Sequence, residues 1–580
     1  MSRSEVSGKG ETDLVECLPD VLLRLLRARG IDDADMEEFL NPSLRNLASP
    51  EELPGVIQAT GILLSAIAEK KTIVVFGDYD CDGVCATAIL VKVLSALMSN
   101  EQDASGRVAP FIPERLTEGY GMSDASVSRL LEEIPDVGLV ITVDNGINSI
   151  KQVADLKARG VSVVVTDHHL PSYARVADGA QGEMLLPEAE VVVNPKVAAP
   201  PHLQNLCGAG VAFFLANSLV AEAKERGLYE GPKIGGPLLV LAGLATVTDS
   251  MPVLGQNRIL VAEALKNFRM CAPLGLRELH FRAARNAHGE LTSRDFGFML
   301  GPRINAAGRL ASGMDALDLV LETNRERVRE YAIRIDLNNA ERKTIEQRMT
   351  DEALAKVVPN AAAQVIDLPD GHPGVAGIVA ARVMERLGET VPVCVLAGGH
   401  GSARAPVGVN IRDAFVACDE VLERYGGHAA AGGFSVKDGQ VDHFRELLAA
   451  YCEKFQTTDM RPGKPTDLWL DPADVTLELA EALVRLEPFG EGNPEPVFGL
   501  RRVLLQDVRP MGAEGRHLSA MVGVPDSRVS ANRLRALWWN HGGLVEELRE
   551  KGACPHDLRF SLSVSDFGER HAELRLVSID

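Results

Sequence analysis

The sequence predicts an α/β protein whose first large domain is a doubly wound, mostly parallel sheet. Between about residues 72 and 255, short β-branched runs such as TIVVFG, GLVITV, VSVVV and VVV alternate with helix-like segments. The segment VCATAILVKVLSALM, after the first run, has the near-continuous apolar character of a buried helix. Each run is followed by a polar turn. Because the carboxyl ends of parallel strands meet at one sheet edge, we expect these turns to gather there.

Composition narrows the class of protein. The chain has 580 residues, 46% of them hydrophobic and 24% charged, which is typical of a globular protein of several domains. A net charge of −21 argues against a nucleic-acid coat protein, but it is compatible with a local basic groove and with bound metal ions. The N-terminus lacks a secretory signal, and the nine cysteines form no CxxC pair. We therefore expect a cytoplasmic protein that has no disulfide framework and does not bind membranes.

The rest of the chain divides into segments that differ in composition and residue pattern. Residues from Met314 to Val358 include neither Gly nor Pro, which predicts one long helix or two. A glycine-rich α/β pattern follows, and after RPGKP short alternating runs predict a small barrel of about five strands. The expected domains are an N-terminal helical segment (1–70) packed against the catalytic domain, the doubly wound domain (71–313), a connecting helix (314–358), a second α/β domain (359–460) and a β domain (461–580).

Acidic residues and histidines follow several of the strand signals. Taken alone, a DxDxD stretch is consistent with a solvated turn, and an HH pair is consistent with core packing or with a helix cap. Several such groups at the ends of strands in one sheet instead predict a site for Mn²⁺ or Mg²⁺, which accept carboxylate and imidazole ligands. Two such ions can activate water for attack on a phosphoester. The residues are Asp78, Asp80 and Asp82 in FGDYDCDG, Asp144 in VDNGI, Asp167, His168 and His169 in VTDHHLP, and Asp249 in VTDSMP.

These motifs, with NPK, GAGVAF and GPRINAAGRL, resemble the DHH phosphoesterases, and among them the single-strand-specific exonucleases. GGHGSARA and GGHAAAGGF resemble the DHH-associated (DHHA1) domain, and LEPFGEGNPEPVF resembles the start of an oligonucleotide-binding (OB) barrel. The resemblance implies a DHH domain, a long connecting helix, a DHHA1 domain that closes a groove around one DNA strand, and a C-terminal OB-like, DNA-binding barrel.

The same resemblance implies an activity and partners. The expected reaction is hydrolysis of single-stranded DNA from 5′ to 3′ into 5′-mononucleotides, by two-metal-ion catalysis with Mn²⁺ or Mg²⁺, in DNA repair and recombination. The expected substrate is single-stranded DNA with a 5′ end. The resemblance also implies a monomer that works with a helicase or a single-strand-binding protein.

The resemblance assigns metal-binding roles to five residues. It implies that Asp80 and Asp82 bind separate metals and that Asp144 bridges them. It further implies that His168 and Asp249 complete the second site.

Catalytic roles beside the metals are implied for Asp78, Asp167 and His169, as inner ligands or as groups that orient ligands and help proton transfer. Pyrophosphatase relatives carry a histidine four residues before Asp80, where this chain has Phe76. We therefore expect the first metal to be held more weakly or by different groups.

Eight further residues are implied to contact the substrate. A terminal phosphate requires clustered donors. For any arginine taken alone, a surface ion pair is the ordinary role, so only the motif context indicates these roles. The residues are Arg115, Ser402 and Arg404 for the 5′-phosphate, Tyr120 to narrow the entrance against duplex, Arg303 and Arg309 for backbone contacts near the cleaved phosphate, and His400 and His428 from the DHHA1 domain.

Two other functions stay open at this point. One is DHH chemistry on a small substrate, such as a cyclic dinucleotide, an oligoribonucleotide or pyrophosphate. The other is a DNA-binding scaffold that has lost catalysis. Small-substrate relatives usually end after the DHHA1 domain, so residues 465–580 favour a polymer. A scaffold would be expected to lose metal ligands, whereas this chain departs from the pattern only at Phe76.

Overall fold

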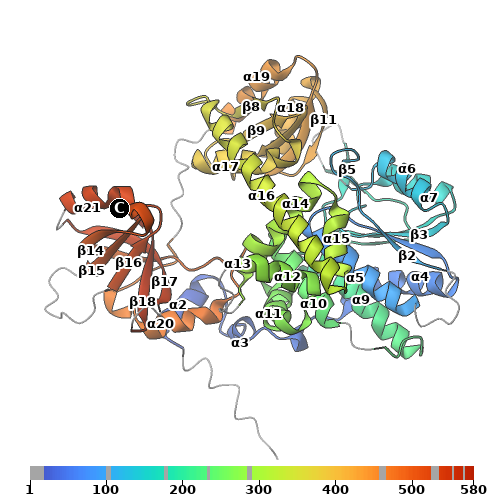
Figure 1. The fold of residues 1–580 in the computed structure, drawn as a ribbon, viewed down its shortest axis with the longest axis horizontal. Coiled ribbons are helices and arrows are strands. Elements are labelled where there is room, and N and C mark those ends of the chain that lie inside the picture. Colours follow the sequence, from blue (N-terminus) through green and yellow to red (C-terminus); the bar gives the residue numbers. More distant parts are fainter. Residues whose placement is uncertain are drawn as a thin grey trace, which may run out of the picture. The chain divides into compact units, whose positions relative to one another are not determined.

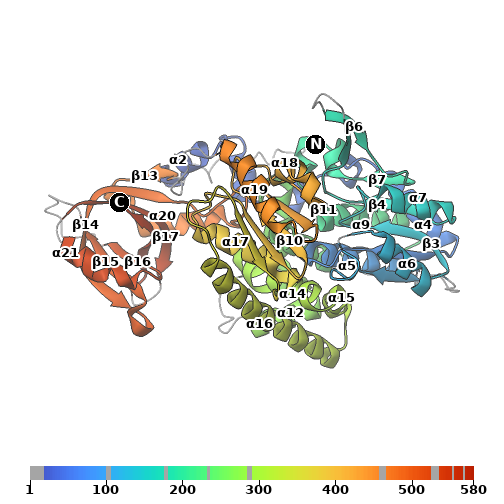
Figure 2. The ribbon, with the colours of Figure 1, turned by 90° about the horizontal axis from the view of Figure 1, so that it is seen from above.

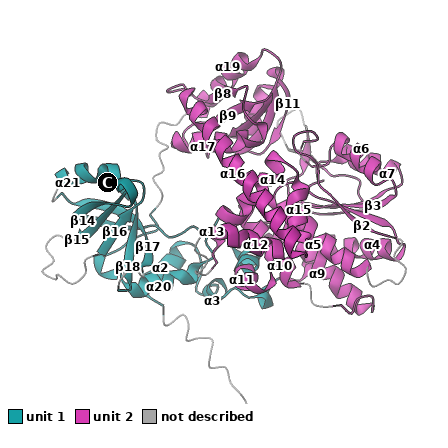
Figure 3. Cartoon of the chain, viewed as in Figure 1, with its two compact units in different colours: residues 1–47, 252–263, 462–580 teal, residues 48–251, 264–461 magenta. Residues whose placement is uncertain are grey.

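The chain forms two compact units. The computed structural model describes residues 18–98, 106–119, 121–175, 181–231, 235–283, 291–455, 466–523, 534–551, 554–565 and 569–580 (Figure 1). The smaller unit comprises residues 1–47, 252–263 and 462–580, and the larger unit comprises residues 48–251 and 264–461 (Figure 3).

The larger unit begins with a five-stranded sheet in which every pairing is parallel. The strands are buried runs of mainly Val and Ile, as expected for a parallel sheet covered on both faces. This confirms the doubly wound domain that the sequence predicts. In sheet order the strands are β2 (Val108–Phe111), β1 (Thr72–Phe76), β3 (Val137–Thr142), β4 (Ser162–Thr166) and β7 (Val191–Val193).

Helices cover both faces of this sheet (Figure 1). On one face lie α6 (Asp124–Glu133) and α7 (Ile150–Ala158), and on the other lie α4 (Val56–Ala68), α5 (Cys81–Met98) and α9 (Gly208–Glu225). Among the described residues, α5 is the one helix long and apolar enough to cross a membrane, but 83% of that stretch is buried inside the domain. It is therefore the core helix that the sequence predicts. A short hairpin of β5 (Ser172–Arg175) and β6 (Gln181–Leu185) follows β4.

A helical layer leads from this domain to the next. Its members are α10 (Gly235–Thr248), α11 (Gly255–Cys271), α12 (Leu274–Ala283), α13 (Ser293–Asp295), the π-helical turn η4 (Phe296–Leu300), α14 (Gly301–Leu310) and α15 (Gly313–Leu321). The first part of α11 belongs to the smaller unit, and the short α8 (Pro195–Ala198) directly follows β7. The connecting helix α16 (Arg325–Ala355) has 31 residues, or about 46 Å, and packs on α12, α14 and α15 (Figure 2). It begins at Asn324, whose side chain accepts from the N–H groups of Glu326 and Arg327. The Gly- and Pro-free region therefore forms two helices.

The second α/β domain is a mixed sheet with helices on both faces. Apolar side chains of α16 and α17 (Ala376–Arg386) fill the core on one face, and those of α18 (Ile411–Ala417) and α19 (Val441–Cys452) fill the core on the other. Only the β8–β9 pairing is parallel among the described strands of this sheet. In sheet order they are β11 (Leu422–Gly427), β12 (Ala431–Val436), β10 (His400–Arg404), β9 (Val393–Ala397) and β8 (Gln364–Leu368).

The smaller unit is a five-stranded barrel. It closes because β14 (Phe498–Met511) pairs with both β15 (His517–Gly523) and β17 (His556–Ser565). The ring is completed by β16 (Leu534–Trp538) and β18 (His571–Ile579), and the two-residue β13 (Leu468–Trp469) adds to β14. The helices α20 (Leu477–Leu483) and α21 (Val545–Lys551) belong to this unit.

The N-terminal helices α2 (Asp20–Ala28) and α3 (Met36–Leu40) share one apolar core with the barrel strands, and α2 contacts α20. Leu22 and Leu25 are fully buried in the same cluster as Phe498 of β14. The expectation that residues 1–70 pack against the catalytic domain is therefore wrong for α2. It holds for α4, which packs on α9, and Phe39 of α3 contacts Arg258, within the predicted range 71–313. The apolar stripe of an amphipathic helix is visible in a sequence, but the surface that covers it is not.

Removal of one α2 side chain should test this packing. All three tryptophans, Trp469, Trp538 and Trp539, lie in the smaller unit, so their fluorescence reports its unfolding. Leu25→Ala leaves a cavity and should lower the free energy of unfolding of this unit by about 2–5 kcal/mol, measured as a lower urea midpoint. Leu63→Ala, at a fully buried position of α4, should leave the tryptophan transition unchanged. An unchanged midpoint in Leu25→Ala would contradict the packing of α2 on the barrel.

Candidate metal centre

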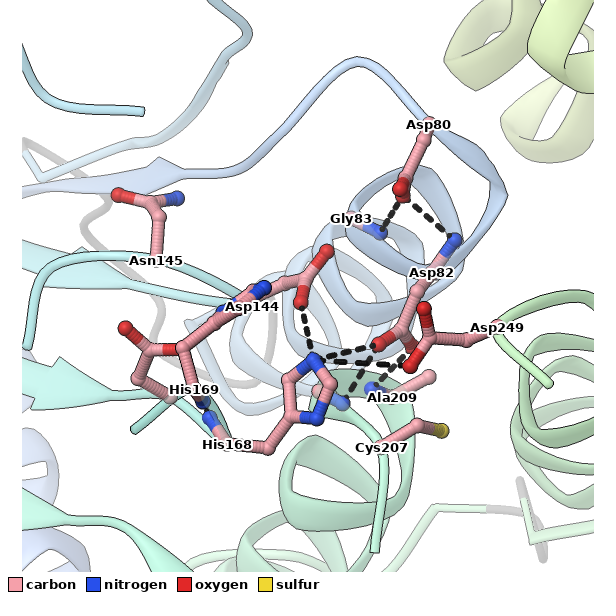
Figure 4. A network of polar contacts seen from close by, with 12 residues as sticks. Asp80, Asp82, Gly83, Asp144, Asn145, His168, His169, Cys207, Ala209 and Asp249 are labelled. Atoms are coloured by element: carbon pink, nitrogen blue, oxygen red, sulfur yellow. Dashed lines mark hydrogen bonds and ion pairs between the residues drawn. The ribbon is translucent and has the colours of Figure 1, made fainter. Parts of the chain in front are cut away.

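Carboxylates and histidines gather at the C-terminal ends of three neighbouring strands (Figure 4). The aspartates of FGDYDCDG follow β1, Asp144 follows β3, and His168 follows β4. Asp249 arrives from the C-terminal end of α10. Asp78, Asp82, Asp144 and His168 are buried, so this edge of the sheet concentrates negative charge away from water.

Two of the aspartates are fixed by the first turns of helices. Oδ1 of Asp80 accepts from the backbone N–H groups of Asp82 (2.9 Å) and Gly83 (3.0 Å) at the start of α5. The two oxygens of Asp82 accept from the N–H groups of Gly208 (2.6 Å) and Ala209 (2.7 Å) at the start of α9. A helix N-terminus stabilises negative charge. Each carboxylate also keeps lone pairs that can bind a cation.

Asp144 is positioned by an unusual backbone conformation. Its φ of 61° lies in the left-handed region, which few residues other than glycine adopt. A Cβ atom at Gly208 would lie 2.6 Å from the Cβ of Asp144, so α9 can approach Asp144 this closely only with glycine there. The carboxylate of Asp144 thereby lies within 3.0 Å of Nε2 of His168.

The ring of His168 faces three carboxylates (Figure 4). Its Nε2 lies 3.0 Å from Oδ1 of Asp144, 3.6 Å from Oδ2 of Asp82 and 3.7 Å from Oδ2 of Asp249. Burial lowers the pKa of His168 to about 4, so the ring is neutral at neutral pH. A neutral imidazole offers a lone pair, which is the form in which histidine binds metals.

The possible ligand atoms form overlapping sets. Within each set they lie within 4.8 Å of one another, and the sets are Asp78, Asp80 and Asp144, then Asp82, His168 and Asp249, and finally Asp144, His168 and His169. Nε2 of His168 and Oδ1 of Asp78 are buried and have no hydrogen-bond partner in the described part of the chain. These residues therefore fit divalent cations.

The carboxylates of the cluster repel one another. Burial, followed by the charges of neighbouring aspartates, raises the pKa of Asp78, Asp144 and Asp249 well above the usual range. The pKa of Asp80 is raised by burial and by Asp82. Divalent cations would remove this repulsion, because they place positive charge among the carboxylates.

Asp167 and His169 form a pair beside the cluster. Oδ1 of Asp167 accepts from the N–H groups of His168 (2.7 Å) and His169 (3.0 Å) and lies 2.8 Å from Nδ1 of His169, while Oδ2 accepts from the N–H of Ile147 (2.9 Å). Burial opposes the charge of His169, but Asp167 outweighs it and raises the pKa of His169 to about 9. Asp167 thus ties the TDHH turn to the VDNGI turn and keeps His169 protonated.

Phe76 lies in the core of the domain. Its side chain is fully buried, and its ring stacks on that of Phe111 with a centroid distance of 5.1 Å. Both rings belong to the apolar cluster of Val127 and Leu130 of α6. The position at which pyrophosphatase relatives carry a histidine is therefore a packing position here, and Asp78 stands with Asp80 and Asp144 instead.

The sequence analysis missed three groups that hold the centre in place. The backbone N–H groups of Gly208 and Ala209 bind Asp82, and Oδ1 of Asn305 accepts from the N–H of Cys81 at 2.7 Å. From the sequence, GAGVAF is visible only as a family motif, and GPRINAAGRL only as a family motif with two arginines. A helix start directly before an apolar run, VAFFLA, could have indicated the first two, since helix N-termini bind anions.

Three predicted substrate residues, Arg115, Arg309 and Arg404, form a cluster of positive charge in the same unit (the basic pocket). The guanidinium of Arg115 lies over the ring of Tyr79 at 5.0 Å, and Nη1 of Arg309 donates to the carbonyl of Gly374 at 3.0 Å. Burial and the charge of Arg115 lower the pKa of Arg309 to about 10 and also lower that of Arg404. Arginine side chains repel one another when they lie close together, so the cluster favours an anion between them.

The start of α17 closes one side of this pocket. A Cβ atom at Gly377 would lie 2.8 Å from Oγ of Ser402 and 3.1 Å from Nη2 of Arg404. Glycine at the second position of α17 therefore leaves room for both side chains beside the helix N-terminus, whose partial positive charge adds to that of the arginines.

The other predicted substrate residues have different neighbours. The ring of His428 stacks over that of His169 with a centroid distance of 6.4 Å, and His400 lies 3.4 Å from the guanidinium of Arg424. Arg303 forms an ion pair with Asp336 of α16 at 2.7 Å. Tyr120 lies outside the described residues.

Comparison with known proteins gives the following relatives. Family models match residues 72–240 (DHH family, N-terminal domain), 359–455 (DHHA1 domain) and 466–577 (RecJ OB domain). The single-stranded-DNA-specific exonuclease RecJ of Dickeya dadantii is 35% identical over 594 residues, covering 97% of this chain and 96% of that protein. Crystal structures of Thermus thermophilus RecJ with Mn²⁺ and with Mg²⁺ match with TM-scores of 0.77 and 0.72, at 30% and 29% identity, covering 97% of this chain and 76% and 74% of those chains.

The pKa shifts predict how stability depends on pH without metal. Folding raises the pKa of Asp78, Asp144, Asp249 and His169. As the pH is lowered, these groups therefore bind protons at a higher pH in the folded state than in the unfolded state. Stability of the metal-free protein should therefore rise as the pH falls from about 8 to about 6.5. Below that pH the neutral His168 opposes the trend.

Thermal unfolding in EDTA and in MnCl₂ across this pH range measures the effect. Cations compete with the protons, so saturating Mn²⁺ should raise the melting temperature most at the upper end of the range and flatten the pH dependence. A melting temperature in EDTA that falls as the pH is lowered through this range would contradict the account.

Proposed function

This chain belongs to the RecJ family of single-stranded-DNA-specific exonucleases, and from this premise we propose that it releases 5′-mononucleotides from the 5′ end of single-stranded DNA with two divalent cations. One observation carries the proposal. In the tripeptide Asp78-Tyr79-Asp80, both aspartates belong to the candidate metal centre. The ring of Tyr79, between them, lies under the guanidinium of Arg115 in the basic pocket. A strand whose terminal phosphate occupied that pocket would have its next phosphate close to the cations.

The metal-binding residues divide into two groups in this proposal. Asp82, His168 and Asp249 would hold one cation, Asp78 and Asp80 the other, and Asp144 both. Bound Mn²⁺ or Mg²⁺ would lower the pKa of a water molecule and stabilise the charge that develops on the phosphate.

The other residues of the centre orient it. Asp167 keeps Nδ1 of His169 protonated and fixes the ring, so Nε2 of His169 can donate to a phosphate or leaving oxygen. Gly208 and Ala209 hold Asp82, and Asn305 holds the start of α5, before any substrate arrives. The centre is thereby preorganised.

The basic pocket would set the direction of hydrolysis. Arg115, Arg309, Arg404 and Ser402 would bind the 5′-terminal phosphate through charge-assisted hydrogen bonds. Because this fixes the end of the strand, hydrolysis would start there and release one nucleotide at a time. His428, beside His169, would contact the strand from the DHHA1 domain.

The wider setting follows from family membership. We extend the proposal to a cytoplasmic, monomeric enzyme of DNA repair and recombination whose partners include a helicase or a single-strand-binding protein. A small substrate is disfavoured because the chain continues into the barrel unit, and an inactive scaffold is disfavoured because the candidate ligands are present and gathered.

Substitution of the shared aspartate tests the metal roles. Asp144→Ala should reduce release of mononucleotides from 5′-labelled single strands below detection, because both cations lose a ligand. Asp167→Asn should cost less, about 10- to 100-fold, because Asp167 only orients its neighbours. Asp136→Asn, at an exposed position before β3, serves as the control and should keep full activity. Release from 3′-labelled ends first, or activity that persists in EDTA, would contradict the proposal.

Substitution of one glycine tests the phosphate pocket. Gly377→Ala should displace Ser402 and Arg404 and reduce the preference for a 5′-phosphate over a 5′-hydroxyl. Arg404→Ala should reduce that preference further, by about 10- to 100-fold in kcat/KM. Gly61→Ala is the matched control, because a Cβ atom there meets open space on helix α4. A preference in Gly377→Ala equal to that of Gly61→Ala would contradict the assignment.

A further inference from the structure

Phe298 is an exposed aromatic side chain on the helical segment that passes the candidate metal centre. It lies in the π-helical turn η4, directly before α14, and 75% of its surface is exposed. Turns of π-helix are rare and occur frequently at functional sites. An exposed apolar residue needs no explanation by itself. The position of Phe298 along the segment is what indicates a role.

The segment runs from the metal centre to the phosphate pocket. Near its start, a Cβ atom at Gly301 would lie 2.2 Å from Cγ2 of Thr248, the residue before Asp249. In its middle, Asn305 accepts from the N–H of Cys81, between the metal-site residues Asp80 and Asp82. At its end, Arg309 reaches the basic pocket.

Phe298 lies on the same segment, before these contacts. Asn305 and Arg309 are four residues apart in α14 and therefore lie on one side of that helix, and Phe298 lies about two turns before Asn305. Phe298 and Arg309 are eleven positions apart, or about 16 Å along the axis. Asn305, which lies beside the metal centre, is between Phe298 and Arg309 along this segment. Phe298 is therefore on the opposite side of the metal centre from the phosphate pocket. On a strand held by its 5′-phosphate, this is the 3′ side of the cleaved bond.

Phe298 contacts a basic side chain. The guanidinium of Arg294 lies over its ring at 5.5 Å, and most of the Phe298 side chain is exposed. The sequence of this region, residues 264–310, has eight Lys or Arg and three Asp or Glu, and two of these arginines, Arg282 and Arg303, pair with Asp336. Exposed aromatic rings among basic side chains are the surface on which single-stranded nucleic acids stack their bases.

We propose that Phe298, with Arg294 against one face of its ring, stacks on an unpaired nucleobase of the substrate on the 3′ side of the cleaved phosphate. The inference rests on the proposed function, since it takes the strand direction from the phosphate pocket. Stacking of this kind tolerates any base, and it requires a base that is not paired in a duplex. Phe298 would therefore add selectivity for single strands beyond the first nucleotide.

A scan with abasic substrates tests this contact. Full-length protein in EDTA is titrated with 5′-phosphorylated single strands, each of which lacks one base at a successive position, and Kd is measured by fluorescence anisotropy. The wild type should lose about 5- to 150-fold in affinity when the stacked base is missing. Phe298→Ala should bind the intact strand more weakly by a similar factor and show no further loss at that position. Phe298→Trp should restore the wild-type profile.

The matched control is Phe281→Ala, which removes an aromatic ring that is 73% exposed on α12. It should keep both the wild-type affinity and the wild-type profile. An abasic profile in Phe298→Ala that equals that of the wild type would overturn the proposal, and so would an equal loss in Phe281→Ala.

A parallel assay with Mn²⁺ separates this inference from the proposed function. Hydrolysis from the 5′ end with an unchanged abasic profile in Phe298→Ala would overturn only the stacking contact. A wild type that shows the profile but does not hydrolyse the strand would overturn only the proposed function. A wild type that binds no single strand would overturn both.

Discussion

Repulsion among buried carboxylates is the constraint on which the rest of the larger unit depends. Asp78, Asp80, Asp82, Asp144 and Asp249 lie close together, and burial followed by the charges of neighbouring carboxylates raises the pKa of four of them, all except Asp82. Such a cluster needs a rigid frame, since free side chains would move apart. The parallel sheet provides converging strand ends, and the first turns of α5 and α9 hold two of the carboxylates through backbone N–H groups.

The same unit carries a second cluster of the opposite sign. Arg115, Arg309 and Arg404 come from three different parts of the chain, and each retains its charge although burial lowers the pKa of Arg309 and Arg404. Cations would stabilise the carboxylate cluster, and an anion would stabilise the arginine cluster. In the proposed function, a nucleic-acid strand with bound metal ions would supply both. Tyr79 and helix α14 connect the clusters and fix the spacing between them.

The sequence predicts the parts of this arrangement that depend on local order. A β-branched run followed by a polar turn identifies β1, β3 and β4 and places Asp144 and His168 at their ends, because the strand order makes those ends adjacent. It does not show that α2 packs on the barrel, nor that Arg303 pairs with Asp336, because both depend on surfaces brought together only by folding. Backbone donors such as Gly208 are also hidden, since any residue has an N–H group and only the approach of α9 to Asp144 requires glycine.

The account turns on whether two cations bind on either side of Asp144. Anomalous X-ray diffraction from crystals of the full chain soaked in Mn²⁺ measures this directly. We expect two peaks about 3.5–4 Å apart, one beside Asp82, His168 and Asp249 and the other beside Asp78 and Asp80, with Asp144 in contact with both. A single peak, or two peaks of which Asp144 touches only one, would contradict the account.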